Sequence, residues 1–494
     1  MSKPEKSMKK INIFFAGLKF WSKQIVAQLL KKDEQENQQL LDENQQSKKN
    51  TFTNDDKLQK SQSYTKVITK DIFKTTPKFF YWFKLISKFI SVQLVVQLLG
   101  FASGILIIRT LSKEEYAYFT IANSLQSIIN VLADTGLSSS IISIGGKIWQ
   151  DDILLSQLLH TGMRLRYYMG ISASFLIVPT MGYLLISNGA SIFYTLFVIV
   201  AILIELNYYF CQQILYIIPL LKSRIKQIQH LDITFASSRL ALIGIASLMP
   251  VDAFIYLFCS TIASGLRTFL IKKWNSDVYL KNNLINKAYE KQIIYAVKNQ
   301  IPYTIFWCIQ GQITILLISS FGSTAGIADV GALGRFAAIF SPLNAVVSSI
   351  FIPSIARCQS MEILKKYYFK AMLFYITISI LFIAISLKLP QIFLWILGSK
   401  YNNLNQELLL IVVTTSISLL ISLNWGINHS RGWITDSWLI IPSTIITQIV
   451  SLMFIDISIT KGVLLFGIVS SLPTLLVNFY LIYKGLNSFE KGDV

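Results

Sequence analysis

The sequence predicts an all-α polytopic membrane protein with about twelve transmembrane helices, arranged as two pseudo-symmetric six-helix bundles. Hydrophobic residues make up 53% of the 494-residue chain and charged residues only 14%, whereas a soluble domain carries about 25% charged residues. Apolar runs of about twenty residues recur from Leu85 to Tyr483, and each is long enough to cross a hydrocarbon core of roughly 30 Å. A transmembrane β-barrel would instead show alternating segments of about ten residues.

Residues 1–84 form a basic extension that we expect to be cytoplasmic. Between Met8 and Lys32, apolar side chains recur at helical spacing, but lysines interrupt them too often for a span. We therefore predict an amphipathic helix on the anionic membrane surface. The alternative is a poorly ordered tail in which the helical spacing of the apolar residues is coincidental. The polar linker DEQENQQLLDENQQSKKN follows, and it has too few apolar residues to build a core.

Twelve spans are expected after this extension, and a long basic loop at 272–298 divides them into two sets of six. Residues 85–275 form the N-terminal bundle, and residues 276–494 form the C-terminal bundle with a short cytoplasmic tail. The expected spans are 86–108, 116–143, 164–187, 191–219, 233–250, 252–271, 297–320, 329–353, 367–388, 406–424, 434–456 and 461–483.

The distribution of basic residues predicts that both termini lie in the cytoplasm. In this orientation the inner loops hold 19 lysines and arginines, Arg164 and Arg166 among them, and the outer loops hold five. Such a bias is typical of the cytoplasmic side of membrane proteins. It accounts for most of the formal net charge of +19, so we expect no nucleic-acid partner.

The two halves show weak self-similarity. The stretch QLVVQLLGFASGILIIRTLSKEEYAYFTIANSL is echoed by QGQITILLISSFGSTAGIADVGALGRFAAIF. Each consists of an apolar helix, a short polar turn and a second helix. Internal repeats of this kind are typical of secondary transporters, whose substrate site lies between the halves.

Several motifs resemble the polysaccharide-export branch of the MOP (multidrug/oligosaccharidyl-lipid/polysaccharide) exporter superfamily, the branch of O-antigen-type flippases. LIIRTLSKEEYAYFTIANSLQSIINVLADTGLSSSII resembles its first hairpin, NQIPYTIFWCIQGQITILLISSFGSTAGIADVGALGRFAAIFSPLNAVVSSIFIPSIA its seventh and eighth helices, and IFLWILGSKYNNLNQELLLI its element before the tenth helix. The resemblance covers residues 85–485, whereas the basic extension departs from the family pattern.

The resemblance implies two bundles around a central cavity that opens to each face of the plasma (inner) membrane in turn. It also implies a flippase that moves a polyprenyl-diphosphate-linked oligosaccharide from the inner to the outer leaflet, for O-antigen, lipopolysaccharide, capsule or exopolysaccharide assembly. The expected partners are this lipid-linked oligosaccharide and the lipid bilayer. A polysaccharide polymerase and glycosyltransferases are candidate protein partners.

Five ionisable residues inside the expected spans are the main functional candidates, because charge within a span is costly and usually faces a cavity. Arg239, Arg335 and Arg267 are candidates for substrate binding, since the guanidinium fork matches phosphate oxygens. Glu205 and Asp134 are candidates for exchanging the proton or cation that drives transport.

Uncharged amides are candidates for contacts with sugar hydroxyls in the same cavity. These amides lie within or beside the apolar helices of the two self-similar stretches: Gln93, Gln97, Asn123, Gln126, Gln310 and Gln312. Each candidate has a structural alternative. Amides also hold helices together, Arg267 is near enough to the inner surface to snorkel, and Asp134 can cap or pair locally.

No catalytic or metal-binding constellation is apparent, so we expect neither an enzyme nor a cofactor or metal. The four cysteines and three histidines are scattered, and Asp151-Asp152 completes neither DxD nor DDxxD, which favours a solvated turn or a helix cap. Two alternatives to a flippase stay open: a cation-coupled small-molecule exporter of the MATE type, and a membrane scaffold or enzyme of polysaccharide synthesis. The arginines suit an anionic substrate better than a cationic drug.

Overall fold

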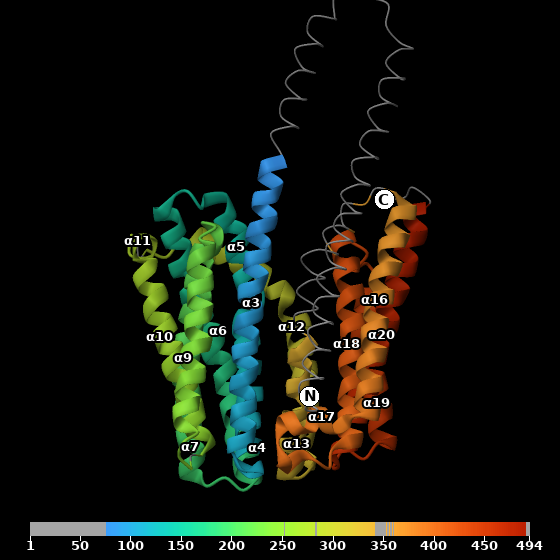
Figure 1. The fold of residues 1–494 in the computed structure, drawn as a ribbon. Coiled ribbons are helices and arrows are strands. Elements are labelled where there is room, and N and C mark those ends of the chain that lie inside the picture. The colour runs from blue at the N-terminus through green and yellow to red at the C-terminus, as the bar shows by residue number, and fades with distance from the viewer. Residues whose placement is uncertain are drawn as a thin grey trace, which may run out of the picture. The chain divides into compact units, whose positions relative to one another are not determined.

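The computed structural model describes residues 76–250, 252–281, 284–340, 352, 355, 358 and 360–490 (Figure 1). Every element of this part is helical, which confirms the predicted all-α class. The described residues from Ile86 onward form one compact unit. The surface helix and polar linker predicted within the basic extension lie outside the described residues.

The first half of the chain begins with a long helix and continues as a series of antiparallel helices. Its described helices are α3 (Thr76–Thr110), α4 (Lys113–Asp134), α5 (Leu137–Ile148), α6 (Asp152–Ser187), α7 (Ile192–Leu215), α8 (Ile217–Leu221), α9 (Ile225–Ala246), α10 (Ala253–Trp274) and α11 (Ser276–Tyr279).

The second half repeats this pattern with more short elements. Its described helices are α12 (Lys287–Phe321), α13 (Thr324–Gly334), η2 (Arg335–Phe340), α16 (Met361–Lys388), α17 (Pro390–Leu397), η4 (Ser399–Tyr401), α18 (Asn405–Arg431), η5 (Ser437–Leu439), α19 (Ile440–Phe454) and α20 (Thr460–Glu490).

Local side-chain chemistry sets several helix boundaries. The Ser112 hydroxyl accepts a hydrogen bond from the backbone N–H of Glu115 (3.1 Å) and so caps α4. Asp151 caps α6 in the same way, which confirms a helix cap at the Asp-Asp pair. The expected span 116–143 is two helices, because Thr135 and Gly136 have left-handed backbone conformations (φ 30° and 79°) that end α4.

Ten helical segments in the described part are long and apolar enough to cross a membrane, as expected for a polytopic helical membrane protein. Helix α9 has the length of a span but is more polar, since it carries Lys226, Asp232 and Arg239. The eighth expected span, 329–353, continues past residue 340 into residues that the structure does not describe.

The prediction of a loop over 272–298 is wrong. Asn286 caps α12 by accepting a hydrogen bond from the backbone N–H of Ala288 (2.9 Å), so this helix starts eleven residues before the expected end of the loop. Its first turns stay helical because Ile293 and Val297 are buried against helices of the first half.

Buried apolar residues join the two halves at one end of the helices. We call the end that carries the turn at Leu111–Ser112 the turn end. The largest core combines Tyr116 and Phe119 of α4 with Leu333 and Phe336 of the second half, and with Tyr401 of η4. A second core belongs to the first half together with the start of α12, and a third belongs to α16, α18, α20 and nearby residues.

Candidate functional site

Two of the three arginines predicted for substrate binding, Arg239 and Arg335, come together with Glu205 near the boundary between the halves. Arg335 starts η2, where α13 gives way to a 3₁₀ turn, and its Nε donates to the Tyr116 hydroxyl of α4 (3.4 Å). Its guanidinium carbon lies 6.0 Å from the centre of the Phe119 ring. The second half therefore places its arginine against α4 of the first half.

Arg239 of α9 interacts electrostatically with both Arg335 and Glu205. Its Nε donates to the Ser260 hydroxyl of α10 at 3.1 Å. Glu205 of α7 accepts hydrogen bonds from the Ser264 hydroxyl (3.4 Å) and from Gln126. We call Glu205, Arg239 and Arg335 the central cluster.

The central cluster has two cations and one carboxylate, and all three side chains are only partly buried. Within the described residues, neither Arg239 nor Arg335 forms a salt bridge, and Glu205 is the carboxylate that interacts with Arg239. A net positive charge in a partly open polar site favours an anionic ligand.

Arg267 has a carboxylate partner, Asp232, that is not among the residues predicted from the sequence. Its Nη2 lies 2.7 Å from Oδ1 of Asp232, and the two side chains are 19% and 14% exposed. Gln93 donates to the other Asp232 oxygen at 3.1 Å, and the Tyr216 hydroxyl donates to the same atom at 3.4 Å. Asp232 stands one residue before the expected fifth span, so hydropathy does not mark it as a charge within a span.

Asp134 is paired rather than free, as its structural alternative anticipated. Arg166 donates to its Oδ1 at 2.8 Å, and Ser138 donates to the same atom. The prediction that Arg166 lies in an inner loop is wrong: it belongs to α6 and is only 1% exposed. The carboxylate of Asp134, on the neighbouring helix α4, compensates the buried charge of Arg166. The spacing of residues along the chain does not reveal such a partner.

The predicted amides have mixed surroundings. Gln126 is buried and reaches Glu205, whereas the Asn123 side chain donates to the Phe119 carbonyl of its own helix (2.7 Å). Gln310 and Gln448 exchange two hydrogen bonds (3.2 and 2.6 Å), which links α12 to α19. Gln97 of α3 and Gln312 of α12 are partly buried.

The turn end is closed by polar contacts between the halves. Arg109 donates from Nε and Nη2 to the carbonyls of Ile396 (3.0 Å) and Trp395 (2.5 Å). Lys400 donates to the carbonyls of Arg109 (3.2 Å) and Leu111 (2.5 Å), and burial lowers the pKa of its ammonium group. These contacts add to the shared apolar core, so polar and apolar groups together join the two halves at the turn end.

No protein-family model matches the sequence, and no match is found among curated proteins. Solved structures are similar in fold. An inward-facing multidrug resistance MATE family transporter of the MOP superfamily matches with a TM-score of 0.63 and 14% identity, over 82% of this chain and 100% of that chain. The lipid II flippase MurJ, in an inward closed conformation, matches with a TM-score of 0.64 and 13% identity, over 81% and 89% of the two chains.

A MATE structure in complex with MaD3S matches with a TM-score of 0.55 and 15% identity, over 82% of this chain and 95% of that chain. Similarity at this level of identity concerns the fold. The chain has the polytopic helical fold that MATE transporters and the MurJ flippase share, which confirms the predicted fold class.

Proposed function

We propose that this protein is a flippase for a polyprenyl-diphosphate-linked oligosaccharide, which it moves from the inner to the outer leaflet of the plasma membrane by alternating access. The observation that carries the proposal is the central cluster, in which Arg239 interacts electrostatically with Arg335 of the other half and with the carboxylate of Glu205. A diphosphate supplies the anionic charge that this cluster favours, and guanidinium groups bind phosphate oxygens through paired hydrogen bonds.

The surroundings of the cluster suit a glycan attached to that diphosphate. Gln126, Ser260 and Ser264 provide amide and hydroxyl groups within reach of the charged side chains. Such groups exchange hydrogen bonds with sugar hydroxyls without the strong attraction that would trap the substrate. In this proposal the turn end faces outward, the closed turn end represents an inward state, and Glu205 or Asp134 binds the driving ion.

Transport of a labelled lipid-linked oligosaccharide by reconstituted protein tests this function directly. We expect Arg239→Gln and Arg335→Gln each to lower the flipping rate by roughly 10- to 100-fold, because a hydrogen bond to a charged group contributes about 1.5–3 kcal/mol. Arg224→Gln is the matched control, since Arg224 pairs with Asp277 (2.9 Å) at the opposite end. Absence of flipping by the wild-type protein would refute the proposal and favour a scaffold, whereas normal flipping by both cluster variants would refute the role of the central cluster.

A MATE-type exporter of small cations is the second candidate, and the carboxylate of Glu205 favours it. Glu205 accepts hydrogen bonds from Gln126 and Ser264, an arrangement that also suits a coupling cation. Ion-driven efflux of a cationic dye that falls at least tenfold in Glu205→Gln, with no transport of the lipid-linked glycan by the wild-type protein, would establish this function instead.

A further inference from the structure

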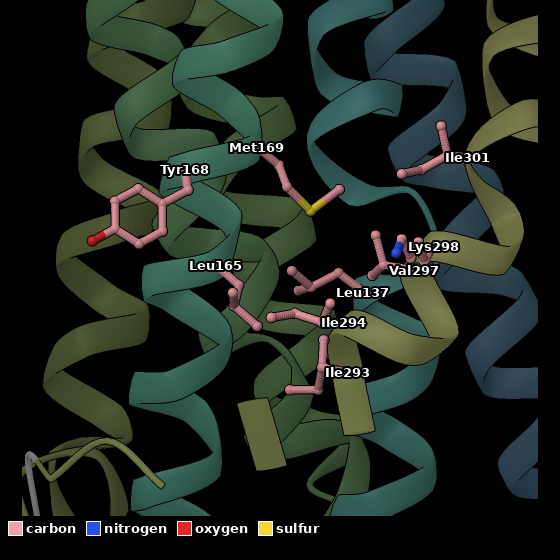
Figure 2. A pocket seen from close by; sticks show the side chains of 9 residues that line it. All are labelled: Leu137, Leu165, Tyr168, Met169, Ile293, Ile294, Val297, Lys298 and Ile301. Carbon is pink, nitrogen blue, oxygen red and sulfur yellow. The ribbon is translucent and has the colours of Figure 1, made fainter. Parts of the chain in front are cut away.

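An apolar cleft of about 180 Å³ lies where α12 meets α5 and α6, on the boundary between the two halves of the chain (Figure 2). Leu137, Met169 and Val297 approach one another there from three different helices. The remaining lining residues are Leu165, Tyr168, Ile293, Ile294, Lys298 and Ile301.

A polar cavity of about 290 Å³ is built on the same stretches of chain. Gly136, Arg166 and Thr304 line this cavity, whereas Leu137, Leu165 and Ile301 line the apolar cleft. Residues close together in the sequence thus line either the apolar cleft or the polar cavity. The other residues of the polar cavity are Asn130, Val131, Asp134, Thr135, Tyr209 and Gln213.

The polar cavity has hydrogen-bonding capacity that the described residues do not use. Arg166 is 1% exposed, and its two Nη atoms donate hydrogen bonds to the Ser138 hydroxyl and the Asp134 carboxylate. Its buried Nε has no hydrogen-bond partner within the described residues. The buried Oδ1 of Asn130 also lacks a partner. Because buried polar atoms are costly when unsatisfied, both indicate a polar ligand or ordered water in this space.

One cationic group lies at the cleft. Lys298 is exposed, and no ion pair is recorded for it within the described residues. It lines the cleft together with Ile301, one turn further along α12, and Thr304 of the following turn lines the polar cavity. A phosphate at Lys298 would therefore stand between an apolar and a polar space.

Helix α12 also has a weak point at this position. Pro302 has no amide hydrogen, so the carbonyl of Lys298 lacks its usual partner four residues later. Prolines inside helices permit bending, and this one lies between the residues that line the two spaces. The boundary with α5 and α6 can therefore widen without breaking another helical hydrogen bond.

We propose that the two adjoining spaces bind the lipid-linked glycan as it enters between the halves. The first isoprenoid units occupy the apolar cleft, the phosphate group contacts Lys298, and the adjacent sugar enters the polar cavity beside Asn130 and Arg166. This inference rests on the proposed function, because it assigns the entry site of the same substrate. It places entry at the α5, α6 and α12 boundary, separate from the central cluster.

Photolabelling of the full-length protein in phosphatidylcholine vesicles tests the entry site. The probe is a polyprenyl diphosphate with a diazirine on the isoprenoid unit nearest the phosphate. We expect labelled peptides to map to α6 and α12, and an excess of unlabelled polyprenyl diphosphate to remove the label. Equal displacement by phosphatidylglycerol would identify a general lipid site and overturn the proposal.

Variants that fill the cleft give the second arm. We expect Met169→Trp and Ile294→Trp each to reduce labelling at least fivefold, and Lys298→Gln to weaken probe binding several-fold, with partial rescue by Lys298→Arg. Ile171→Trp is the matched control, because Ile171 lies on the same helix and is 64% exposed. Undiminished labelling in both cleft variants, with normal size-exclusion profiles, would refute the site.

A variant of the central cluster distinguishes failure of the entry site from failure of the flippase function on which it rests. Arg239→Gln should keep the label at α6 and α12 while it loses flipping. Wild-type protein that is labelled at these helices but moves no lipid-linked glycan would contradict the flippase. Flipping without label at α6 and α12 would contradict only the entry site.

Discussion

Lys113 of α4 forms an ion pair with Asp329 of α13, with 2.8 Å between Nζ and Oδ1. The pair joins the first and second halves of the chain at the turn end. Arg109 and Lys400 add hydrogen bonds between the same two halves, as Arg109 lies at the end of α3 and Lys400 in η4. The charged turn that the sequence places between two apolar helices thus closes one end of the molecule.

Removing this ion pair should shift the protein toward states in which the turn end is open. The side chains are 32% and 12% exposed, so we assign about 0.5–1 kcal/mol to the pair, which corresponds to a two- to fivefold change in population. Spin labels at Ile192 and Ile459, two exposed positions near this end, would report a longer distance in Lys113→Ala. Lys113→Asp combined with Asp329→Lys should restore the wild-type distribution, and a distribution that is the same in all three proteins would contradict the prediction.

Close helix packing at the turn end gives a steric test of the same closure. A Cβ atom at Gly331 of α13 would overlap the side chain of Thr120 on α4. We expect Gly331→Val to disfavour the closed turn end by about 1–3 kcal/mol, the usual cost of overpacking. Spin-label distances between the same two positions measure the effect. Gly334→Val is the control, because nothing lies within 4 Å of a Cβ at that position, and an equal effect of both variants would argue against a steric cause.

Much of the fold and part of the site could be predicted from the sequence. Arg239, Arg335 and Glu205 could each be predicted as functional candidates, because a charge within an apolar span is costly. The structure places the three side chains in one cluster. The helical class and most spans followed from hydropathy, which depends on composition over about twenty residues. These are properties of a single segment.

The partners of these residues could not be predicted, because they depend on which helices touch. Asp232 lies one residue before its expected span, and Arg166 was counted with the basic residues of an inner loop, yet each forms an ion pair with a residue on another helix. The early start of α12 was missed for a similar reason: its polar first turns are held by packing against the first half. Positive charge near a span end marks the cytoplasmic side on average, but a nearby carboxylate can bury an individual arginine.

The Arg166–Asp134 pair should couple strongly in a double-mutant cycle. Asp134→Asn leaves the guanidinium of Arg166 buried without a countercharge, whereas Arg166→Met with Asp134→Asn removes both charges. Because the Asp134 side chain is 37% exposed, we expect the single variant to lose about 1–3 kcal/mol and the double variant to lose less. Thermal unfolding in detergent measures both. Additive losses would show that the two side chains act independently.

The pH dependence of stability provides a last test, at the end of the molecule opposite the turn. Asp436 precedes η5 and accepts hydrogen bonds from Lys484 of α20 (2.6 Å) and from the Tyr480 hydroxyl (3.3 Å). The hydrogen bond from Lys484 holds the pKa of the Asp436 carboxyl below its ordinary value. A carboxyl whose pKa is lower in the folded state contributes stability above its unfolded pKa of about 3.9, and this contribution is lost as the pH falls through the folded value.

Wild-type protein should therefore melt at a higher temperature than Asp436→Asn at pH 6, and the difference should shrink below about pH 4. A difference at Asp436 that stayed constant down to pH 3 would exclude the ion pair with Lys484 as its source.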